Sequence, residues 1–401
     1  MARTNIDASD LGGWGRLACD AALGLTAVVE AMHHNISLVP WILGLPADGR
    51  TRGMTGLVYG SIRGATRLAG LGFDVATKRA AAAPGERSLP AEREVLLAAL
   101  NGVVGDHLAA TDNPLAIQMR FRLAGRPLAL ERRELAAAIP KPGARLLVLV
   151  HGLCMSDLRW SRLGHDHGAA LARDLGYTPV YLHYNSGLHV STNGRSLAQA
   201  LERLTREWPV PLQDVTILGH SMGGLVARSA CHYGAAAGHR WLRQLGALVF
   251  LGTPHHGVPL ERGGNWVHAA LGISRYTAPL SGLAVLRSAG ITDLRHGNLL
   301  DEDWEGRGRF DLGRHRPRPV PLPERVRCHA IAATTARTCD LAGRIVGDGL
   351  VPLDSALGRH SDPDRALPLP RSRQWIGRGM GHNDLLSHPR VYARIRRWLE
   401  R

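Results

Sequence analysis

Cysteine is scarce in this chain of 401 residues, and its few positions follow no recognisable spacing. The number of cysteines is odd, and no two of them are separated by only two residues. Neither a paired-cysteine zinc site nor a disulfide framework is therefore indicated. We expect reduced thiols and a cytoplasmic protein, because thiols persist in a reducing compartment. The five residues are Cys19, Cys154, Cys231, Cys328 and Cys339.

Sequence signals for export and for crossing a membrane are also missing. The N-terminus lacks the basic, apolar and small-residue order of a signal peptide, because Asp7, Asp10 and Asp20 interrupt it. No uninterrupted apolar run is long enough to span a bilayer. Any contact with a membrane or lipid surface is thus expected to be peripheral.

Acidic residues are the minority charge. The chain contains 34 Asp and Glu residues and 49 Lys and Arg residues, which gives a formal net charge of +15. Such an excess attracts nucleic acids and anionic membranes. However, the sequence contains no zinc-finger spacing, no aromatic RNA-binding strand and no basic heptad region. We predict no nucleic-acid partner and interpret the excess as general surface charge, with contact to acidic lipid as the second interpretation.

The remaining composition is that of a globular protein, with 45% hydrophobic and 21% charged residues. We predict two parts, a helical N-terminal extension over residues 1–85 and one larger α/β domain over residues 86–401. In the extension, small residues recur every three or four positions among arginines and apolar residues. Two interpretations stay open: a helical hairpin packed on the larger domain, or a basic amphipathic helix on a membrane or lipid granule.

Strands and helices are expected to alternate along the larger domain, as in a mostly parallel central sheet flanked by helices. The alternation stops between about 258 and 325, where we expect a lid-like insertion; a surface loop is the alternative. The apolar runs predict strands at 146–150, 179–184, 215–218, 245–251, 327–335 and 375–377, and a hairpin at 121–130. Helices are predicted at 91–108, 166–175, 194–207, 222–233 and 389–399.

The most informative motif is Gly219-x-Ser221-x-Gly223, which lies between the predicted strand at 215–218 and the predicted helix at 222–233. This spacing is typical of a nucleophile elbow, a sharp turn from a strand into a helix. Small residues on both sides of the apex keep such a turn free of Cβ clashes. Ser221 is therefore predicted to project from the sheet edge, close to the free N–H groups of the new helix.

A second motif, His151-Gly152-Leu153, follows the predicted strand at 146–150. Parallel strands present their carboxyl ends at one edge of a sheet, so this motif is expected to lie beside Ser221. The backbone N–H of Leu153 is then one predicted donor to a substrate oxyanion. The N–H of Met222, directly after the serine, is the other.

A carboxylate and an imidazole follow the serine, in the chain order Ser221, Asp348, His382. Asp348 stands between two glycines just beyond a predicted strand, and His382 stands on a glycine-flanked loop. A serine hydroxyl needs a base to take its proton, and the imidazole needs a carboxylate to orient it. We predict Ser221 as nucleophile, His382 as base and Asp348 as orienting acid. The alternatives are His360 and His388 for the base, and Asp340 and Asp354 for the acid.

From about residue 146 to its C-terminus, the chain resembles bacterial lipases and esterases of the α/β-hydrolase superfamily. Within that superfamily it is similar to the branch related to inositol deacylases. The chain order of serine, acid and base is the one found in this superfamily. The motifs that carry the resemblance are His151-Gly152-Leu153, the Gly-His-Ser-Met-Gly-Gly at 219–224, the Gly-Thr-Pro-His-His-Gly at 252–257, the Asp-Gly-Leu-Val-Pro at 348–352, and Gly381-His382.

The resemblance implies the α/β-hydrolase fold and hydrolysis of a carboxylic ester, from a small molecule or a lipid, through an acyl-serine intermediate. It implies no cofactor. Some related lipases hold a structural calcium, but no ligand set for that ion stands out in this sequence, so we predict no metal. Two alternatives stay open. One is an acyltransferase with the same triad, and the other is a lipid- or granule-surface binding protein with a vestigial site.

Overall fold

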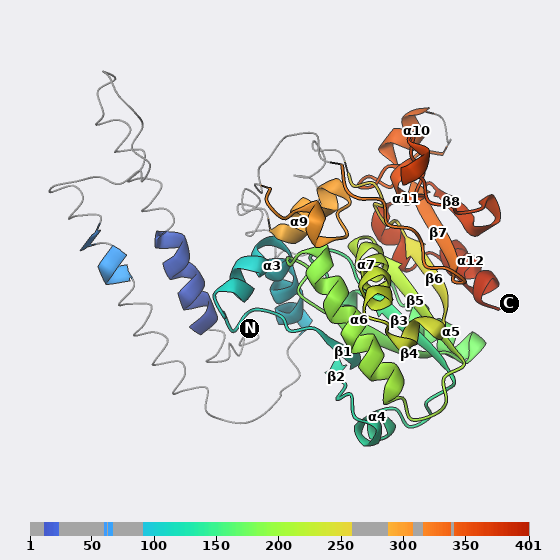
Figure 1. Ribbon diagram of the computed structural model, residues 1–401, viewed down its shortest axis with the longest axis horizontal. Coiled ribbons are helices and arrows are strands. Elements are labelled where there is room, and N and C mark those ends of the chain that lie inside the picture. The colour runs from blue at the N-terminus through green and yellow to red at the C-terminus, as the bar shows by residue number, and fades with distance from the viewer. Residues whose placement is uncertain are drawn as a thin grey trace. The chain divides into compact units, whose positions relative to one another are not determined.

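The computed structural model describes residues 12–23, 60–61, 63–66, 91–258, 288–307, 316–337 and 341–400 (Figure 1). The chain divides into two compact units, one formed by residues 1–87 with 108–116 and the other by residues 88–107 with 117–401. The boundary at residue 85 stays a prediction. Several predicted features lie outside the described residues: most of the extension, most of the lid-like insertion, Cys339 and the alternative acid Asp340.

In the first unit, residues 12–23 form a helix. Asn113 Nδ2 donates a hydrogen bond to the Gly13 carbonyl at 3.1 Å, and Arg16 Nη1 donates to the Asp112 carbonyl at 3.2 Å. These bonds hold the helix to the segment 108–116 of the same unit. In the part of the chain that the structure describes, no helix is both long enough and apolar enough to cross a membrane.

The second unit contains an eight-stranded sheet in the order β2-β1-β4-β3-β5-β6-β7-β8. The hairpin β1–β2 and the pair β1–β4 are antiparallel, and all the other neighbours are parallel. This sheet, flanked by helices, confirms the predicted α/β fold class with a mostly parallel central sheet. The strands are β1 (Arg120–Leu123), β2 (Arg126–Pro127), β3 (Arg145–Val150), β4 (Thr178–His183), β5 (Asp214–His220), β6 (Leu245–Leu251), β7 (Arg327–Thr334) and β8 (Gln374–Arg378).

The register of the central strands brings the predicted catalytic segments to one edge of the sheet. Val150, the last residue of β3, pairs with Gly219 of β5, and His220 pairs with Leu251, the last residue of β6. The chain therefore leaves three neighbouring strands at almost the same level. Ser221 directly follows β5 at that edge.

Helices precede, connect and follow these strands. The longer ones are α3 (Ala91–Ala110), α5 (His167–Leu175), α6 (Val190–Arg206), α7 (Met222–Ala236) and α12 (Pro389–Leu399). The shorter ones are α4 (Arg132–Ala138), α9 (Ala289–His296), α10 (Leu341–Val346) and α11 (Leu353–Ala356). Single 3₁₀ turns are η1 (Asp157–Trp160), η2 (Arg240–Arg243), η4 (Asp301–Asp303), η5 (Pro363–Arg365), η6 (Arg371–Arg373) and η7 (His382–Leu386).

The sequence places β6 and α12 at their observed bounds, but two predictions are wrong in a physically informative way. The helix predicted at 194–207 begins at Val190 instead, because the Asp293 carboxylate accepts the Val190 N–H at 2.8 Å. Because the capping residue is so distant in sequence, no residue near Val190 indicates that a helix begins there. The loop that carries Asp348 follows the helix α10 rather than a strand, since α10 intervenes after β7.

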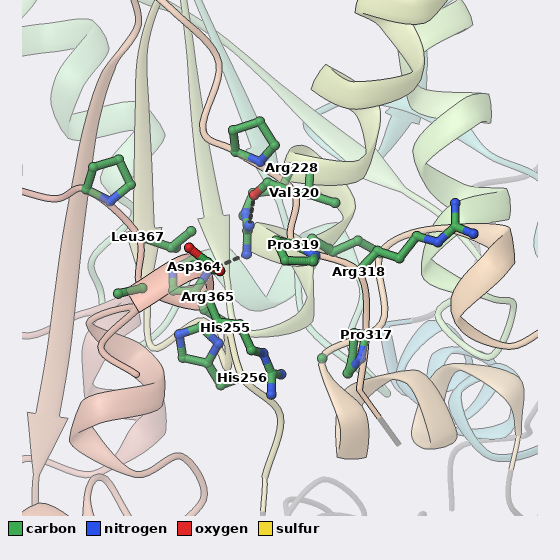
Figure 2. Close-up of a pocket in the computed structure, with 15 residues that line it drawn as sticks. Arg228, His255, His256, Pro317, Arg318, Pro319, Val320, Asp364, Arg365 and Leu367 are labelled. Atoms are coloured by element: carbon green, nitrogen blue, oxygen red, sulfur yellow. Dashed lines mark hydrogen bonds between the residues drawn. The ribbon is translucent and has the colours of Figure 1, made fainter. Parts of the chain in front are cut away.

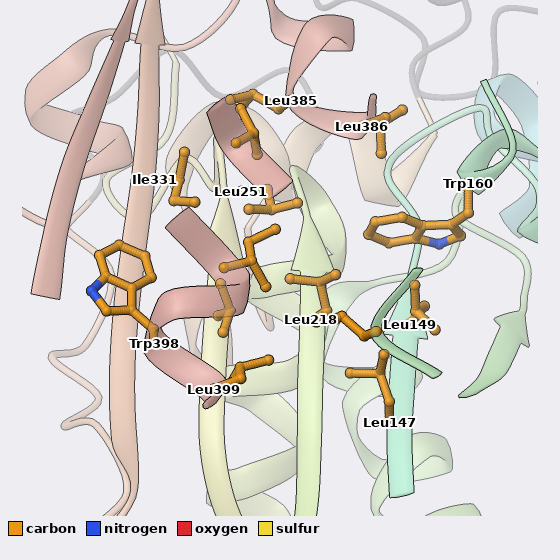
Figure 3. Close-up of a cluster of buried hydrophobic side chains, with 14 of the residues drawn as sticks. Leu147, Leu149, Trp160, Leu218, Leu251, Ile331, Leu385, Leu386, Trp398 and Leu399 are labelled. Atoms are coloured by element: carbon orange, nitrogen blue, oxygen red, sulfur yellow. The ribbon is translucent and has the colours of Figure 1, made fainter. Parts of the chain in front are cut away.

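A hydrophobic core fills the space between one face of the sheet and α12. Figure 3 shows leucines of β3, β5 and β6 on the same side as Trp398 and Leu399 of α12. This packing has the 3.6-residue period of an amphipathic helix, whose buried residues Val391, Ile395 and Leu399 recur every four positions. The core also contains Leu385 and Leu386 of η7, and it thereby anchors the loop that begins with His382.

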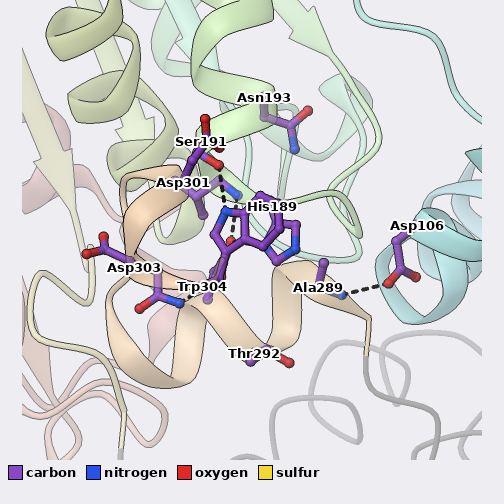
Figure 4. A network of polar contacts seen from close by, with 12 residues as sticks. Asp106, His189, Ser191, Asn193, Ala289, Thr292, Asp301, Asp303 and Trp304 are labelled. Carbon is purple, nitrogen blue, oxygen red and sulfur yellow. Dashed lines mark hydrogen bonds and ion pairs between the residues drawn. The ribbon is translucent and has the colours of Figure 1, made fainter. Parts of the chain in front are cut away.

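Residues 288–307, the longer described part of the predicted insertion, contact the N-terminus of α6 through polar groups (Figure 4). The Asp293 carboxylate oxygen Oδ2 lies 3.0 Å from the His189 ring nitrogen Nδ1 and also accepts the Val190 N–H. The His189 ring stacks on Trp304 at 3.7 Å, and Trp304 Nε1 donates to Ser191 Oγ at 3.0 Å. These contacts fix the segment against the N-terminus of α6.

Candidate active site

Ser221 lies at the apex of the turn between β5 and α7, with φ 55° and ψ −124°. A positive φ is unfavourable for a residue with a side chain, so the surrounding structure must hold it. The Ser221 N–H donates to the Leu251 carbonyl at 2.8 Å, and the Ser221 carbonyl accepts the Gly224 N–H at 3.1 Å. Its hydroxyl is buried and has no hydrogen-bond partner among the described residues.

Two glycines provide the space for this turn. A Cβ at Gly219 would lie 2.7 Å from the Gly224 backbone. A Cβ at Gly223 would lie 2.2 Å from the Val150 carbonyl oxygen at the end of β3. Gly223 therefore lets the first turn of α7 press against the neighbouring strand.

The segment after β3 lies against the nucleophile. A Cβ at Gly152 would be 3.0 Å from the Ser221 Cβ. Leu153 and Met222 are both almost fully buried, and neither N–H donates a hydrogen bond to any described residue. Two unused N–H groups on either side of a serine are what an oxyanion hole requires.

His151 orients one of these N–H groups, a role that the sequence did not reveal. Its Nδ1 lies 2.9 Å from the Gly152 carbonyl oxygen, which accepts only a donor, so the proton is on Nδ1. In a trans peptide, this carbonyl and the Leu153 N–H point in opposite directions, and holding one directs the other. Burial lowers the pKa of His151 to about 3, so its ring is neutral. The ring stacks on Tyr184 at 4.3 Å.

Asp348 and His382 form a buried pair, with 2.7 Å between Asp348 Oδ2 and His382 Nδ1. The other carboxylate oxygen accepts the N–H groups of Leu350 at 3.0 Å and Val351 at 2.8 Å. Three hydrogen bonds thus fix the carboxylate in one orientation. A bond from Nδ1 to the carboxylate leaves Nε2 as the imidazole nitrogen that faces the reaction.

The His382 backbone links this pair to the residue before the nucleophile. Its N–H donates to the Asp348 carbonyl at 3.1 Å, and its carbonyl lies 3.3 Å from His220 Nε2. The His220 and His382 rings are 4.7 Å apart. Burial, and then the neighbouring His382, keep the pKa of His220 well below its usual value, so His220 is a neutral donor. Gly252 follows Leu251, whose carbonyl accepts the Ser221 N–H. A Cβ at Gly252 would lie 3.1 Å from the His382 ring.

The alternative acid and bases within the described residues occupy other positions. Asp354 pairs with Arg344 at 2.7 Å on the surface. His388 Nδ1 accepts the Arg390 N–H at the start of α12, and His360 Nδ1 accepts the Asp362 N–H. Each of these side chains serves a local cap or a surface pair.

The insertion approaches the same edge of the sheet. A Cβ at Gly290 of α9 would lie 3.1 Å from the Met222 side chain and 2.1 Å from the Ser186 carbonyl. The Gly290 N–H donates to the Gly187 carbonyl at 3.0 Å. Among the described residues, no group of three or more His, Cys, Asp and Glu side chains is arranged to hold a metal ion.

Comparisons with known proteins give a family model of undefined role and several distant structures. The model, described as a domain of unknown function (DUF7379), matches residues 126–297. No curated protein matches the sequence.

The similar solved structures include lipase B of Aspergillus fumigatus, with 14% identity and a TM-score of 0.40 over 67% of this chain. The match spans only 57% of that lipase's own length. An esterase of Pyrococcus furiosus has 13% identity and a TM-score of 0.39, over 64% of this chain and 82% of the esterase. A hyperthermophilic esterase of Pyrobaculum calidifontis has 14% identity and a TM-score of 0.37, over 80% of this chain and 93% of the esterase.

Proposed function

We propose that this chain is a serine hydrolase that cleaves carboxylic esters of small molecules or lipids through an acyl-serine intermediate. The observation that carries the proposal is the 2.7 Å bond between Asp348 and His382 at the sheet edge where Ser221 has its strained backbone conformation. A buried carboxylate bonded to one imidazole nitrogen raises the basicity of the other nitrogen. An elbow serine at the same edge is the group that needs such a base.

In the first half-reaction, Ser221 Oγ attacks the ester carbonyl carbon while His382 Nε2 takes the hydroxyl proton. The tetrahedral oxyanion accepts hydrogen bonds from the Leu153 and Met222 N–H groups, each worth about 3–4 kcal/mol in the transition state. The carbon–oxygen bond to the alcohol then breaks, and the alcohol leaves with the proton from His382. Asp348 stabilises the imidazolium throughout.

In the second half-reaction, water takes the place of the alcohol. His382 removes a proton from the water as its oxygen attacks the acyl carbon. The bond to Ser221 Oγ breaks, the serine recovers the proton, and the carboxylic acid leaves. If a second alcohol competes with water at this step, the same site performs acyl transfer.

Hydrolysis of p-nitrophenyl esters with acyl chains from two to sixteen carbons tests the proposal. We expect the wild-type chain to release p-nitrophenol and Ser221→Ala to lose this activity, while Ser161→Ala, at an exposed serine, retains it. The chain-length profile separates an esterase from a lipase. Addition of an alcohol acceptor separates a transferase, which forms a new ester in place of the acid. A folded wild-type chain that cleaves no ester, with detergent present, overturns the proposal.

We further propose peripheral contact with acidic lipid, supported only by the net charge of +15 and the predicted extension over residues 1–85. Flotation of the full chain with phosphatidylserine vesicles at low salt tests this contact. Recovery of the chain in the vesicle-free fraction contradicts it.

A further inference from the structure

A pocket of about 180 Å³ lies beside Arg228 in the second turn of α7 (Figure 2). Its lining includes Arg228 of α7 and the consecutive residues His255 and His256, which follow β6. Gly297, Leu299 and the segments 317–321 and 364–368 complete it. All of these residues belong to the unit that contains the sheet. We call this site the Arg228 pocket.

Arg228 is a buried cation without a counter-charge among the described residues. Only 4% of the residue is exposed. Its Nη2 donates to the Val320 carbonyl at 2.6 Å, and its Nη1 donates to His255 Nδ1 at 3.3 Å, as Figure 2 shows. Within the described part of the chain, its Nε has no hydrogen-bond partner, and no carboxylate is among the groups that shift its pKa. Buried charges in proteins are nearly always paired, because desolvation of a lone charge is costly.

The arginine retains its charge at neutral pH. Burial lowers the pKa of Arg228 to about 10, still well above neutrality. Its two partners in the fold, a carbonyl and an imidazole, are both neutral acceptors. Three of its five N–H donors therefore have no partner among the described residues. A guanidinium with several free donors can bind an anion.

His255 supplies a second donor at the same place. Arginine only donates, so His255 Nδ1 is the acceptor of the bond from Arg228 and the ring proton is on Nε2. That Nε2 is buried and has no hydrogen-bond partner among the described residues. Burial, followed by the nearby Arg228, holds the pKa of His255 well below its usual value. The ring is therefore a neutral N–H donor.

The charges around the pocket define the ligand. Three arginines, Arg228, Arg318 and Arg365, and one carboxylate, Asp364, line it, which gives a formal charge of 3 − 1 = +2 for the lining. Glu302 lies 3.8 Å from Arg318 at the surface and lowers this sum to +1 when that ion pair is counted. Burial lowers the pKa of His256 to about 4, so this residue adds no charge at neutral pH. The surplus is positive in either count and suits an oxyanion, and arginine binds phosphate oxygens in a bidentate manner. Proline and leucine side chains in the same wall suit an organic substituent.

We propose that the Arg228 pocket binds a phosphate monoester, with the dianionic phosphate on Arg228 and its organic part against the apolar wall. This binding function is separate from ester hydrolysis at Ser221. The phosphate monoester comes from a soluble metabolite or from a phosphatidic acid headgroup, since both present the same dianionic group.

Isothermal titration of the full chain with inorganic phosphate and with glycerol phosphate, at constant ionic strength, tests the site. We expect saturable binding with one site per chain. The double variant Arg318→Gln with Arg365→Gln should weaken phosphate binding about three- to tenfold, since each substitution removes a partly screened charge. Arg228→Lys should weaken it at least about tenfold by removal of the planar fork. Arg133→Gln, at an exposed arginine outside the pocket, is the control for the loss of a surface positive charge.

Two sets of results decide the proposal. Saturable binding by the wild type, weakened in the double variant and unchanged in Arg133→Gln, supports it even if Arg228→Lys fails to fold. Absence of saturable binding, or equal affinity in the double variant and the control, overturns it. Vesicles with and without phosphatidic acid identify the source. Binding that needs these vesicles and weakens in the double variant assigns a lipid headgroup, whereas vesicle binding that the double variant retains overturns the site.

Discussion

Helix α7 carries two buried polar sites that differ in how their charge is balanced. Ser221 precedes the helix, and Arg228 lies seven residues further on, about 10 Å along the axis at 1.5 Å per residue. At the first site, the proposed mechanism places a positive charge on His382 during turnover, and Asp348 lies 2.7 Å from it. At the second, Arg228 is a cation throughout, and both of its protein partners are neutral.

The comparison teaches that the charge balance of a buried site indicates the charge of its ligand. A buried charge that the protein does not neutralise requires a ligand of opposite charge. The proposed catalytic site at Ser221 contains its own counter-charge, so the ester that we propose as its substrate need carry no charge. The Arg228 pocket has a surplus of positive charge, so its ligand must be anionic. Neutral substrates and anionic ligands should therefore respond to different substitutions on the same helix.

Ser221→Ala should give the largest effect and the sharpest separation of the two sites. Without the nucleophile, we expect the kcat for ester hydrolysis to fall by at least about 10⁴-fold. Phosphate binding should keep its wild-type affinity, because the hydroxyl does not touch the Arg228 pocket. Parallel esterase assays and phosphate titrations measure both quantities. An alanine variant that still hydrolyses esters at the wild-type rate would remove Ser221 from the mechanism.

Asp348→Asn makes the first site resemble the second by removal of its counter-charge. We expect the kcat to fall by about 10³- to 10⁴-fold, because the amide orients the imidazole wrongly and cannot stabilise the imidazolium. Asp354→Asn is the matched control, since Asp354 pairs with Arg344 on the surface. Steady-state kinetics of both variants at pH 7 measure the difference. Equal losses, or a loss only in Asp354→Asn, would reverse the assignment of the acid.

Sequence reasoning predicts the chemistry of the first site better than that of the second. Ser221, Asp348 and His382 each stand in a local motif, and apolar periodicity alone predicts the bounds of β6 and α12. His151 and His220 stand in the same motifs, but their hydrogen bonds to backbone carbonyls depend on tertiary contacts. No local pattern indicates such bonds.

Distant contacts set the features that the sequence did not predict. The start of α6 depends on Asp293, 103 positions away. That Arg228 has no counter-charge among the described residues depends on which groups approach it, namely His255 after β6 and Val320, 92 positions away. In the sequence, Arg228 is one more basic residue in a chain with many.

Gly223→Ala should disturb the scaffold that both sites share. The new Cβ would lie 2.2 Å from the Val150 carbonyl oxygen and 2.6 Å from that of His151, so the helix and strand must separate. We expect the free energy of unfolding to fall by about 2 kcal/mol, as for other overpacked sites. Gly234→Ala, on the same helix with 3.2 Å to the Trp241 ring, should change it by no more than about 1 kcal/mol. Urea denaturation of both variants measures these values, and equal stability would show that the helix has room to move.

His329→Phe tests the comparison at a buried histidine. Unlike arginine, a histidine that is buried without a partner can lose its charge by release of its proton. His329 is 4% exposed, neither ring nitrogen has a hydrogen-bond partner among the described residues, and its ring stacks on Trp398 at 4.6 Å. Burial, with Arg373 and Arg327 nearby, lowers the pKa of His329 to about 4, against 6.5 for an unperturbed histidine. Between those values the unfolded chain binds a proton that the folded chain excludes, so stability falls as the pH drops below 6.5.

A phenylalanine at this position keeps the ring stack and binds no proton. Relative to the wild type, we therefore expect His329→Phe to gain about 1 kcal/mol in its free energy of unfolding between pH 8 and pH 5, after allowance for residual solvation. Urea denaturation at both pH values measures the gain, and His232→Phe, at a partly exposed histidine of α7, is the control. An identical pH dependence in His329→Phe and the wild type would mean that His329 is protonated in the fold. A histidine would then tolerate burial as a cation, as Arg228 does, and the contrast between a releasable and a permanent charge would not hold.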